Sequence, residues 1–302
     1  MRILVSGSSG LIGTALSEAL VRDGHTIGRL VRTAGSRDAQ PGDVRWDPVA
    51  GVFDAAAAEG ADAVVHLAGA SIADGRWTAA RKQLLRSSRI EATRHLVESL
   101  GTLARPPQIF IGASAIGYFG DRGDESLDET SAPGTDFLAT LTQEWEREEA
   151  RARGRFGARV VSMRTGIVLA KNGGALPRMA LPFKLGAGGR LGSGRQWMSW
   201  IALRDVVGIA QFALANSALA GPVDTVAPEP QRNADFTRAL AEVMHRPAIF
   251  PAPAFALRLA LGEMADALLL SSQRVSPRRL TEAGYAFAQT DLRAALREAL
   301  GK

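Results

Sequence analysis

The chain has no cysteine among its 302 residues, which excludes disulfide bridges, cysteine nucleophiles and cysteine-based metal sites. Its histidines lie far apart and match no metal-ligand spacing, so no metal site is predicted; they are His25, His66, His95 and His245. Long apolar runs are also missing, and we expect no membrane partner. The first residues resemble a short strand rather than a signal peptide, which predicts a cytoplasmic protein.

Blocks of like charge are also absent, although the formal net charge is +5. Arginine is scattered among aspartate and glutamate, and aromatic residues do not alternate with it as they do on nucleic-acid-binding surfaces. We therefore expect no nucleic-acid partner. Hydrophobic residues make up 46% of the chain, which is enough for the packed core of two domains or of one large domain.

The most informative feature is a glycine turn near the N-terminus. An apolar strand at residues 2–6 leads directly into Gly-Ser-Ser-Gly-Leu-Ile-Gly at residues 7–13, and an amphipathic helix follows. Strand, glycine turn and helix in this order are typical of a dinucleotide site, because the helix directs free N–H groups at the pyrophosphate. The alternative is a glycine-rich loop without a ligand. The predicted cofactor contacts here are Gly7, Ser9, Gly10, Leu11, Ile12 and Gly13.

The end of the second predicted strand indicates which dinucleotide binds. Sites that prefer NAD place an acidic residue there, about 20 residues after the glycines, to accept a hydrogen bond from the ribose 2′-hydroxyl. This chain has Arg32 at that point, followed by Ser36 and Arg37, with no carboxylate before Asp38. A guanidinium matches a 2′-phosphate in charge and geometry, so we expect NADP as the cofactor. The alternative is a solvated basic loop.

Strands and helices alternate through the first half of the chain, which predicts an α/β fold with a Rossmann-type doubly wound parallel sheet. Residues 72–99 are expected to be largely helical, and a further helix is expected over 137–153. We predict an NADP(H)-binding domain at 1–170, to which residues 198–230 return. Residues 171–197 and 231–302 would form a smaller, mainly helical C-terminal substrate lobe. Ligands of such sheets bind at the carboxyl ends of the strands.

These motifs together resemble the extended short-chain dehydrogenase/reductase superfamily, and in particular its epimerase-family branch with a C-terminal domain of unknown function. The resemblance covers essentially the whole chain and rests on residues 7–13, 66–70, 114–120, 164–169, 194–201 and 276–280. It implies that Asp47 accepts from the adenine amino group, although Asp47 could instead cap the turn at Pro48. It further implies that the cofactor contacts include Leu67, Ala68, Gly69, Ile167 and Val168. His66 is interpreted as a core residue.

Proton transfer is where the chain departs from this family. Relatives use a serine on a strand and Tyr-x-x-x-Lys on the next helix. Ser114 matches the serine, but residues 137–145 contain neither tyrosine nor lysine. The chain has only two tyrosines, and Tyr118, four residues after Ser114, is the candidate for the phenol. Ser114 and Tyr118 are thus the predicted catalytic residues. The alternative for Tyr118 is packing against the cofactor.

The resemblance also implies a substrate contact at Arg195, in a glycine-rich arm where relatives with nucleotide-sugar substrates grip a diphosphate; a surface arginine is the alternative. The sequence thus predicts an NADP(H)-dependent oxidoreductase or epimerase that transfers a hydride to or from a small-molecule substrate. The alternative is a non-enzymatic NADP(H)-binding redox sensor or scaffold. Exposed helices of the kind that pair in this superfamily favour a homodimer.

Overall fold

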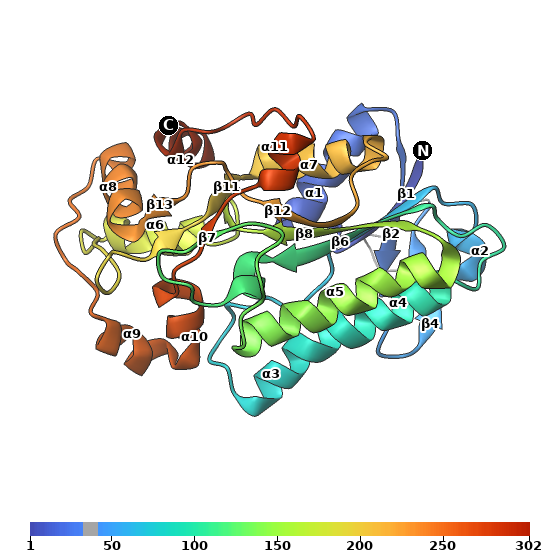
Figure 1. Cartoon of the computed structure of the whole chain (residues 1–302), viewed down its shortest axis with the longest axis horizontal. Helices are drawn as coiled ribbons and strands as arrows, with labels where there is room; N and C mark the ends of the chain where they lie inside the picture. The colour runs from blue at the N-terminus through green and yellow to red at the C-terminus, as the bar shows by residue number, and fades with distance from the viewer. Residues whose placement is uncertain (33–41) are drawn as a thin grey trace.

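The computed structural model describes residues 1–32 and 42–302, and its centre is a twisted sheet (Figure 1). Within the described residues this sheet has eight strands in the order β12-β8-β6-β5-β1-β2-β3-β4, and only β4 at the edge runs antiparallel to its neighbour. In chain order the strands are β1 (Arg2–Ser6), β2 (Thr26–Val31), β3 (Val44–Asp47), β4 (Val52–Phe53), β5 (Ala63–His66), β6 (Ile109–Ala115), β8 (Arg159–Thr165) and β12 (Gly221–Thr225).

Helices cover both faces of this sheet. Alternate residues of β1 point to opposite faces: Ile3 packs with Leu16 of α1 (Leu11–Arg22) and with α7 (Leu203–Ala215). Leu4 packs on the other face with Leu96 of α4 (Ala92–Leu100) and Ala152 of α5 (Phe137–Phe156). Figure 1 shows α1 and α7 along one face and the pair α4 and α5 along the other. The predicted doubly wound α/β fold is therefore confirmed.

The direction of winding reverses between β1 and β5. From β1 the chain builds outward through β2 and β3 on one side, and then returns to add β5, β6, β8 and β12 on the other. In sheets of this kind a crevice forms outside the carboxyl ends of the strands at such a switch point, and ligands bind there. The glycine turn after β1 and the loop after β5 both lie at this point.

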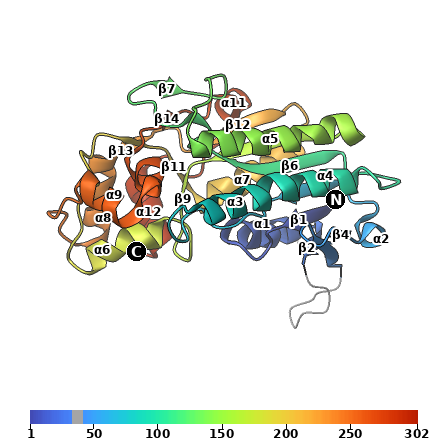
Figure 2. The same ribbon diagram turned by 90° about the horizontal axis from the view of Figure 1, so that it is seen from below.

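The smaller lobe is mainly helical, as expected, and lies at one end of the sheet (Figure 2). Its core joins Trp200, Phe236, Leu240 and Leu296. Its helices are α6 (Leu176–Lys184), α8 (Asn233–Met244), α9 (Ala254–Leu261), α10 (Glu263–Ala265), the π-helical η3 (Asp266–Leu270) and α12 (Leu292–Leu300). The short α11 (Arg278–Glu282) follows β14 (Arg274–Val275), which pairs with β7 (Ser126–Leu127). The division into residue ranges given above stays a prediction.

Two further strand pairs connect the lobe to the sheet. β9 (Ile167–Leu169) pairs in parallel with β11 (Trp200–Ala202), and β10 (Trp197–Met198) pairs antiparallel with β13 (Gln231–Arg232). None of these short strands was predicted from the sequence, because strands of two or three residues carry little periodicity. Across the described residues, no helix combines the length and the apolar character that a membrane span requires.

The expectation that residues 72–99 are largely helical is confirmed from Ala79 onward, and only residues 72–78 depart from it. Helix α3 (Ala79–Arg86) begins only after Thr78, whose side chain accepts a hydrogen bond from the N–H of Arg81 and so caps the helix. Residues 72–78 form a loop instead, in which the indole of Trp77 donates to the carbonyl of Ile72 at 2.9 Å. Between α3 and α4 the helix widens into a π-helical segment, η1 (Ser87–Glu91). Such segments are frequent at functional sites.

Candidate functional site

The glycine turn after β1 packs closely against the loop after β5. Gly7 has φ +67°, and a Cβ there would lie 2.9 Å from the backbone nitrogen of Ala68 and from the carbonyl oxygen of Leu67. A Cβ on Gly13 would lie only 2.1 Å from the Gly7 carbonyl oxygen, so helix α1 can approach the turn only with glycine at this position. The helix begins at Gly10 with no side-chain cap. Its first N–H groups therefore have no capping side chain and can bind an anion.

A buried hydrogen-bond chain fixes the loop after β5. The Ser6 hydroxyl accepts from the N–H groups of Leu67 (3.0 Å) and Ala68 (3.2 Å), so it donates its own proton to Nδ1 of His66 at 2.6 Å. Nε2 of His66 then donates to the hydroxyl of Thr93 at 3.0 Å. Burial lowers the pKa of His66 to about 4, so the imidazole is neutral near pH 7. His66 is thus a satisfied core residue, as interpreted from the sequence.

The other predicted cofactor contacts are exposed or half-buried in the structure, and their contact with a cofactor stays a prediction. Ser9, Gly10 and Gly69 are exposed, and the half-buried residues among them are Leu11, Ile12, Leu67, Ala68, Ile167 and Val168. Arg32 is exposed directly after β2, whereas Ser36, Arg37 and Asp38 lie outside the described residues.

Asp47 ends β3, and its Oδ1 accepts from the N–H groups of Val49 (3.0 Å) and Ala50 (3.1 Å). Its carboxylate therefore caps the turn at Pro48, which was the alternative stated for it; the adenine contact stays a prediction.

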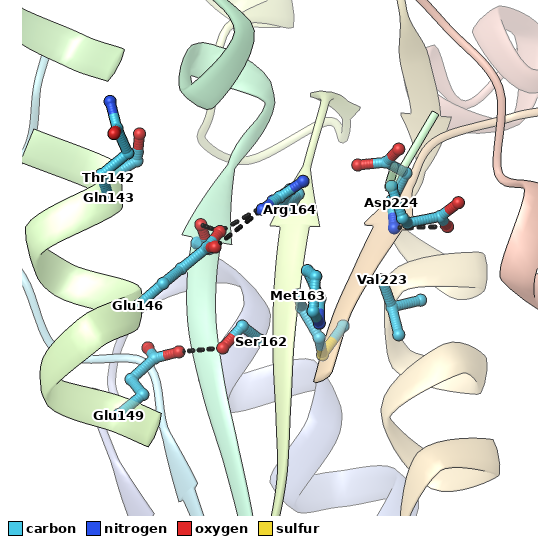
Figure 3. Close-up of polar contacts among 12 residues, drawn as sticks. Thr142, Gln143, Glu146, Glu149, Ser162, Met163, Arg164, Val223 and Asp224 are labelled. Carbon is cyan, nitrogen blue, oxygen red and sulfur yellow. Dashed lines mark hydrogen bonds and ion pairs between the residues drawn. The ribbon is translucent and has the colours of Figure 1, made fainter. Parts of the chain in front are cut away.

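Three neighbouring strands place polar residues side by side near their carboxyl ends. Ser114 of β6, Arg164 of β8 and Asp224 of β12 are register partners, so their side chains emerge on the same face of the sheet, beneath α5. Glu146 of α5 points toward them (Figure 3). The Ser114 hydroxyl donates to Glu146 Oε1 at 2.6 Å, and Arg164 donates through Nε and Nη2 to the two oxygens of Glu146 at 2.8 Å each. Arg164 of this bidentate pair is buried and Glu146 is largely so, and the pair holds Ser114 in one orientation.

Tyr118 joins the same network through its ring. It lies in the 3₁₀ segment η2 (Ile116–Phe119), and the Arg164 guanidinium carbon is 3.4 Å from its ring centroid. Tyr118 borders an open groove of about 640 Å³ between α5 and the start of β12, whose wall includes Gln143, Arg147, Ala150, Gly221 and Pro222. The structure therefore brings Ser114 and Tyr118 together indirectly, through Glu146 and Arg164.

Two more carboxyl groups are buried beside this network. Glu149, one turn further along α5, accepts a hydrogen bond from the hydroxyl of Ser162. A Cβ on Gly112 would lie only 2.1 Å from the carboxyl carbon of Glu149, so the glycine leaves room for this side chain. Burial raises the pKa of Glu149 well above its usual value. The pKa of Asp224 is raised as well, by burial and then by the nearby Glu129, and neither of its oxygens has a hydrogen-bond partner. The interior here holds more acid than one arginine neutralises.

The first turns of α5, where relatives carry tyrosine and lysine, are apolar here. Phe137, Leu138 and Leu141 pack with Trp77 of the loop before α3 and with Met264 of the C-terminal lobe. This part of α5 is a contact between the lobe and the sheet domain. The ammonium of Lys82, on helix α3, lies 4.8 Å from the centroid of the Phe137 ring and is paired with Glu263 of the lobe at 2.5 Å.

Arg195 is exposed on the glycine-rich arm at residues 192–196. Its N–H donates to Ser193 at 3.2 Å and its carbonyl accepts from Arg232. Gln196 anchors the arm by donating to the carbonyls of Leu191 and Leu269. Within the described part of the chain, no hydrogen bond joins this arm to Ser114 or Tyr118. The role of Arg195 toward a substrate stays a prediction.

Sequence reasoning missed Glu146, Glu149 and Asp224 and gave Arg164 no role beyond that of a motif residue. A signal was present for Arg164 and Asp224: each directly follows an apolar residue within a predicted strand, and a charge at a buried strand position requires a partner. Glu146 and Glu149 were hidden in a helix rich in glutamate and arginine.

A glycine turn at the switch point of a doubly wound sheet defines the Rossmann class of protein. Residues 3–226 match the NAD dependent epimerase/dehydratase family, and residues 252–299 match a domain of unknown function, DUF1731. The chain belongs to the NAD dependent epimerase/dehydratase family, which confirms the resemblance stated from the sequence.

Known relatives match the chain over nearly its whole length. An epimerase family protein of Mycobacterium bovis is 45% identical over 97% of this chain and 96% of its own. The human epimerase family protein SDR39U1, solved with NADPH, superposes with a TM-score of 0.90 at 34% identity and covers all of both chains. A nucleoside-diphosphate sugar epimerase of Corynebacterium glutamicum gives 0.82 at 35% identity, covering this chain fully and 58% of its own.

Proposed function

We propose that this protein is an NADP(H)-dependent oxidoreductase or epimerase that acts on a small substrate by hydride transfer. The observation that carries the proposal is the glycine turn, which is compressed onto the loop after β5 and opens the uncapped end of α1 to the crevice between β1 and β5. The human relative solved with NADPH supports the choice of cofactor. Arg32, exposed at the end of β2, supports a preference for the 2′-phosphate.

The residues present fit such a cofactor. The N–H groups at the start of α1 would hold the pyrophosphate, Arg32 the 2′-phosphate, and Ile167 and Val168 the nicotinamide. When bound, the nicotinamide supplies or accepts the hydride. The protein would supply the polar groups that meet the reacting oxygen.

Ser114 is the first of these groups. Its proton is donated to Glu146, so its oxygen keeps lone pairs that can accept a hydrogen bond from a substrate hydroxyl. Glu146 and Arg164 act as positioning residues, because they fix the Ser114 hydroxyl and the Tyr118 ring in one network. Tyr118 is the candidate for proton transfer, and the groove beside its ring gives it access to solvent.

A non-enzymatic NADP(H)-binding protein is the second candidate. Two observations favour it: Phe137, Leu138 and Leu141 occupy the place of the family's acid–base helix, and Ser114 is only 5% exposed. A protein of this kind would keep the cofactor crevice and use cofactor occupancy as its signal.

One experiment separates the two candidates. Purified protein is titrated with NADPH and NADH by calorimetry, and NADPH consumption is then followed by absorbance with a panel of aldehydes, ketones and nucleotide sugars. Binding with turnover supports the enzyme, whereas binding without turnover on any substrate supports the sensor or scaffold. Absence of binding to both cofactors would refute both.

A further inference from the structure

The half-buried guanidinium of Arg89 lies beside the loop after β5 and has no carboxylate partner among the described residues. The guanidinium carbon of Arg89 would be 3.2 Å from a Cβ on Gly69, so the glycine leaves the room that this guanidinium fills. Its hydrogen bonds, from Nη1 to the carbonyl of Leu85 and to the hydroxyl of Ser88, are long, at 3.5 Å each. Across residues 1–32 and 42–302 no carboxylate forms an ion pair with it.

A second arginine reaches the same loop. Arg81 donates through Nη2 to the carbonyl of Ser71, and its Nε is buried with no hydrogen-bond partner. Asp74 lies within electrostatic reach of Arg81, but its carboxylate pairs with Arg178 at 2.7 Å. Burial and, to a smaller extent, the nearby charge of Arg81 together lower the pKa of Arg89 to about 10. Two cations are thus held close together with no ion-pair partner of their own, which is costly.

The local backbone is arranged around these two side chains. Arg89 lies in the π-helical segment η1, a form that is often found at functional sites. Ser88 of the same segment accepts from the N–H of Ala70 at 3.2 Å, so η1 holds the loop in place. The loop then leads back to Leu67 and Ala68, which touch Gly7 of the glycine turn. Arg89 therefore lies at the switch point of the sheet.

We propose that Arg89, assisted by Arg81, forms an oxyanion-binding subsite beside residues 69–71, in the crevice between β1 and β5. An oxyanion there would supply the charge that both guanidinium groups lack, and the planar fork of Arg89 would bind two of its oxygens. The source is either the pyrophosphate of the dinucleotide or an anionic group of the substrate. Both sources rest on the proposed function, whereas oxyanion binding by itself can be tested without it.

The test compares Arg89→Met with Arg89→Lys and with a matched control, Arg94→Met. Methionine keeps much of the length and packing of arginine without its charge, and Arg94 pairs with Glu148 at 2.6 Å in the neighbouring helix α4. Circular dichroism and thermal unfolding verify the fold of each variant. If Arg89→Met does not fold, the lysine variant, which keeps the charge but loses the fork, carries the comparison.

Calorimetry gives affinities for NADPH and NADH, and inorganic phosphate is titrated separately into protein with and without saturating NADPH. If the subsite takes the pyrophosphate, Arg89→Met weakens NADPH and NADH alike, at least tenfold, and Arg94→Met weakens neither. If it takes a substrate group, cofactor affinities stay unchanged, and phosphate binding to the NADPH-loaded protein is lost in Arg89→Met only.

Unchanged affinities for both cofactors and for phosphate in Arg89→Met would overturn the subsite, leaving Arg89 to pack over the ring of Trp145, whose centroid is 5.1 Å away. If the wild type binds neither cofactor, the proposed function fails, and phosphate binding to the unliganded protein decides the subsite alone. Absence of phosphate binding in the wild type would then overturn it too.

Discussion

The carboxyl edge of the sheet has two parts, one around β1 and β5 and the other around β6, β8 and β12, and their charged groups are arranged differently. Around β1 and β5 the described residues present the uncapped start of α1, the neutral His66 and two arginines that have no ion-pair partner. Around β6, β8 and β12 the interior holds Glu146, Glu149 and Asp224, with Arg164 paired to one of them. The first half lacks a counter-charge and is suited to an external anion. The second half supplies its own charges and uses them to position side chains.

This difference explains why the first half of the site could be predicted from the sequence more fully than the second. A site for an anion needs glycines and free N–H groups, which leave a pattern along the chain. A network of buried charges needs only that its members meet in space. Two questions can be tested: whether the part around β1 and β5 binds an anionic ligand, and whether the part around β6, β8 and β12 contributes to catalysis.

The largest effect is expected from Gly10→Val. The branched side chain would enter the space at the start of α1, where a Cβ added to Gly10 would lie 3.2 Å from the Gly7 carbonyl oxygen. NADPH binding should fall by more than about 100-fold, since the backbone could no longer approach the pyrophosphate. Calorimetry measures the affinity, and an unchanged thermal midpoint verifies the fold. Wild-type affinity in this variant would place the cofactor elsewhere.

The neutral state of His66 predicts an acid sensitivity of folding. Its pKa is lowered in the fold from 6.5 to about 4, so the unfolded chain binds this proton first as the pH falls. The free energy of unfolding should therefore decrease by about 3 kcal/mol between pH 6.5 and pH 4 on account of this residue. His66→Gln keeps a donor and an acceptor but cannot titrate. Urea unfolding at several pH values should show a flatter acid limb in the variant; parallel curves would contradict the prediction.

Tyr118→Phe tests the other half of the edge. The substitution removes the hydroxyl and keeps the ring that stacks on Arg164, so NADPH affinity should stay at the wild-type value. If the phenol transfers the proton, turnover on any substrate found should fall by about 100-fold. Steady-state rates and calorimetry on the same preparation give both numbers. Full turnover in the variant would identify Tyr118 as a packing residue.

The smallest effect is expected from Arg32→Ala, and it sharpens the comparison with Arg89. Loss of a charge-assisted contact to the 2′-phosphate should weaken NADPH by about tenfold and leave NADH unchanged, because only NADPH carries that phosphate. Arg89→Met should instead affect both cofactors if its ligand is the shared pyrophosphate. Equal losses for NADPH and NADH in Arg32→Ala would mean that Arg32 does not select between them.

The sequence by itself determined the order of elements, the glycine turn and the missing Tyr-x-x-x-Lys pair. These features are local: residues 7–13 need only their own backbone and the adjoining strand and helix to form the turn. The same local reasoning gave residues 72–99 as largely helical but did not locate the start of the helix, which the Thr78 cap sets, or its π-helical segment at Ser87–Glu91. Periodicity alone does not show where such a helix begins.

Only the tertiary structure decided which charges meet. Ser114, Arg164 and Asp224 become neighbours through the register of three strands, and Glu146 joins them because of the face that α5 turns to the sheet. Arg89 and Gly69 are likewise brought together by the packing of η1 on the loop after β5. Register and helix rotation are set by the burial of many apolar side chains at once. The residues adjacent to a given position in the sequence do not determine strand register or helix rotation. For this physical reason the charge network around β6, β8 and β12 was not predicted from the sequence.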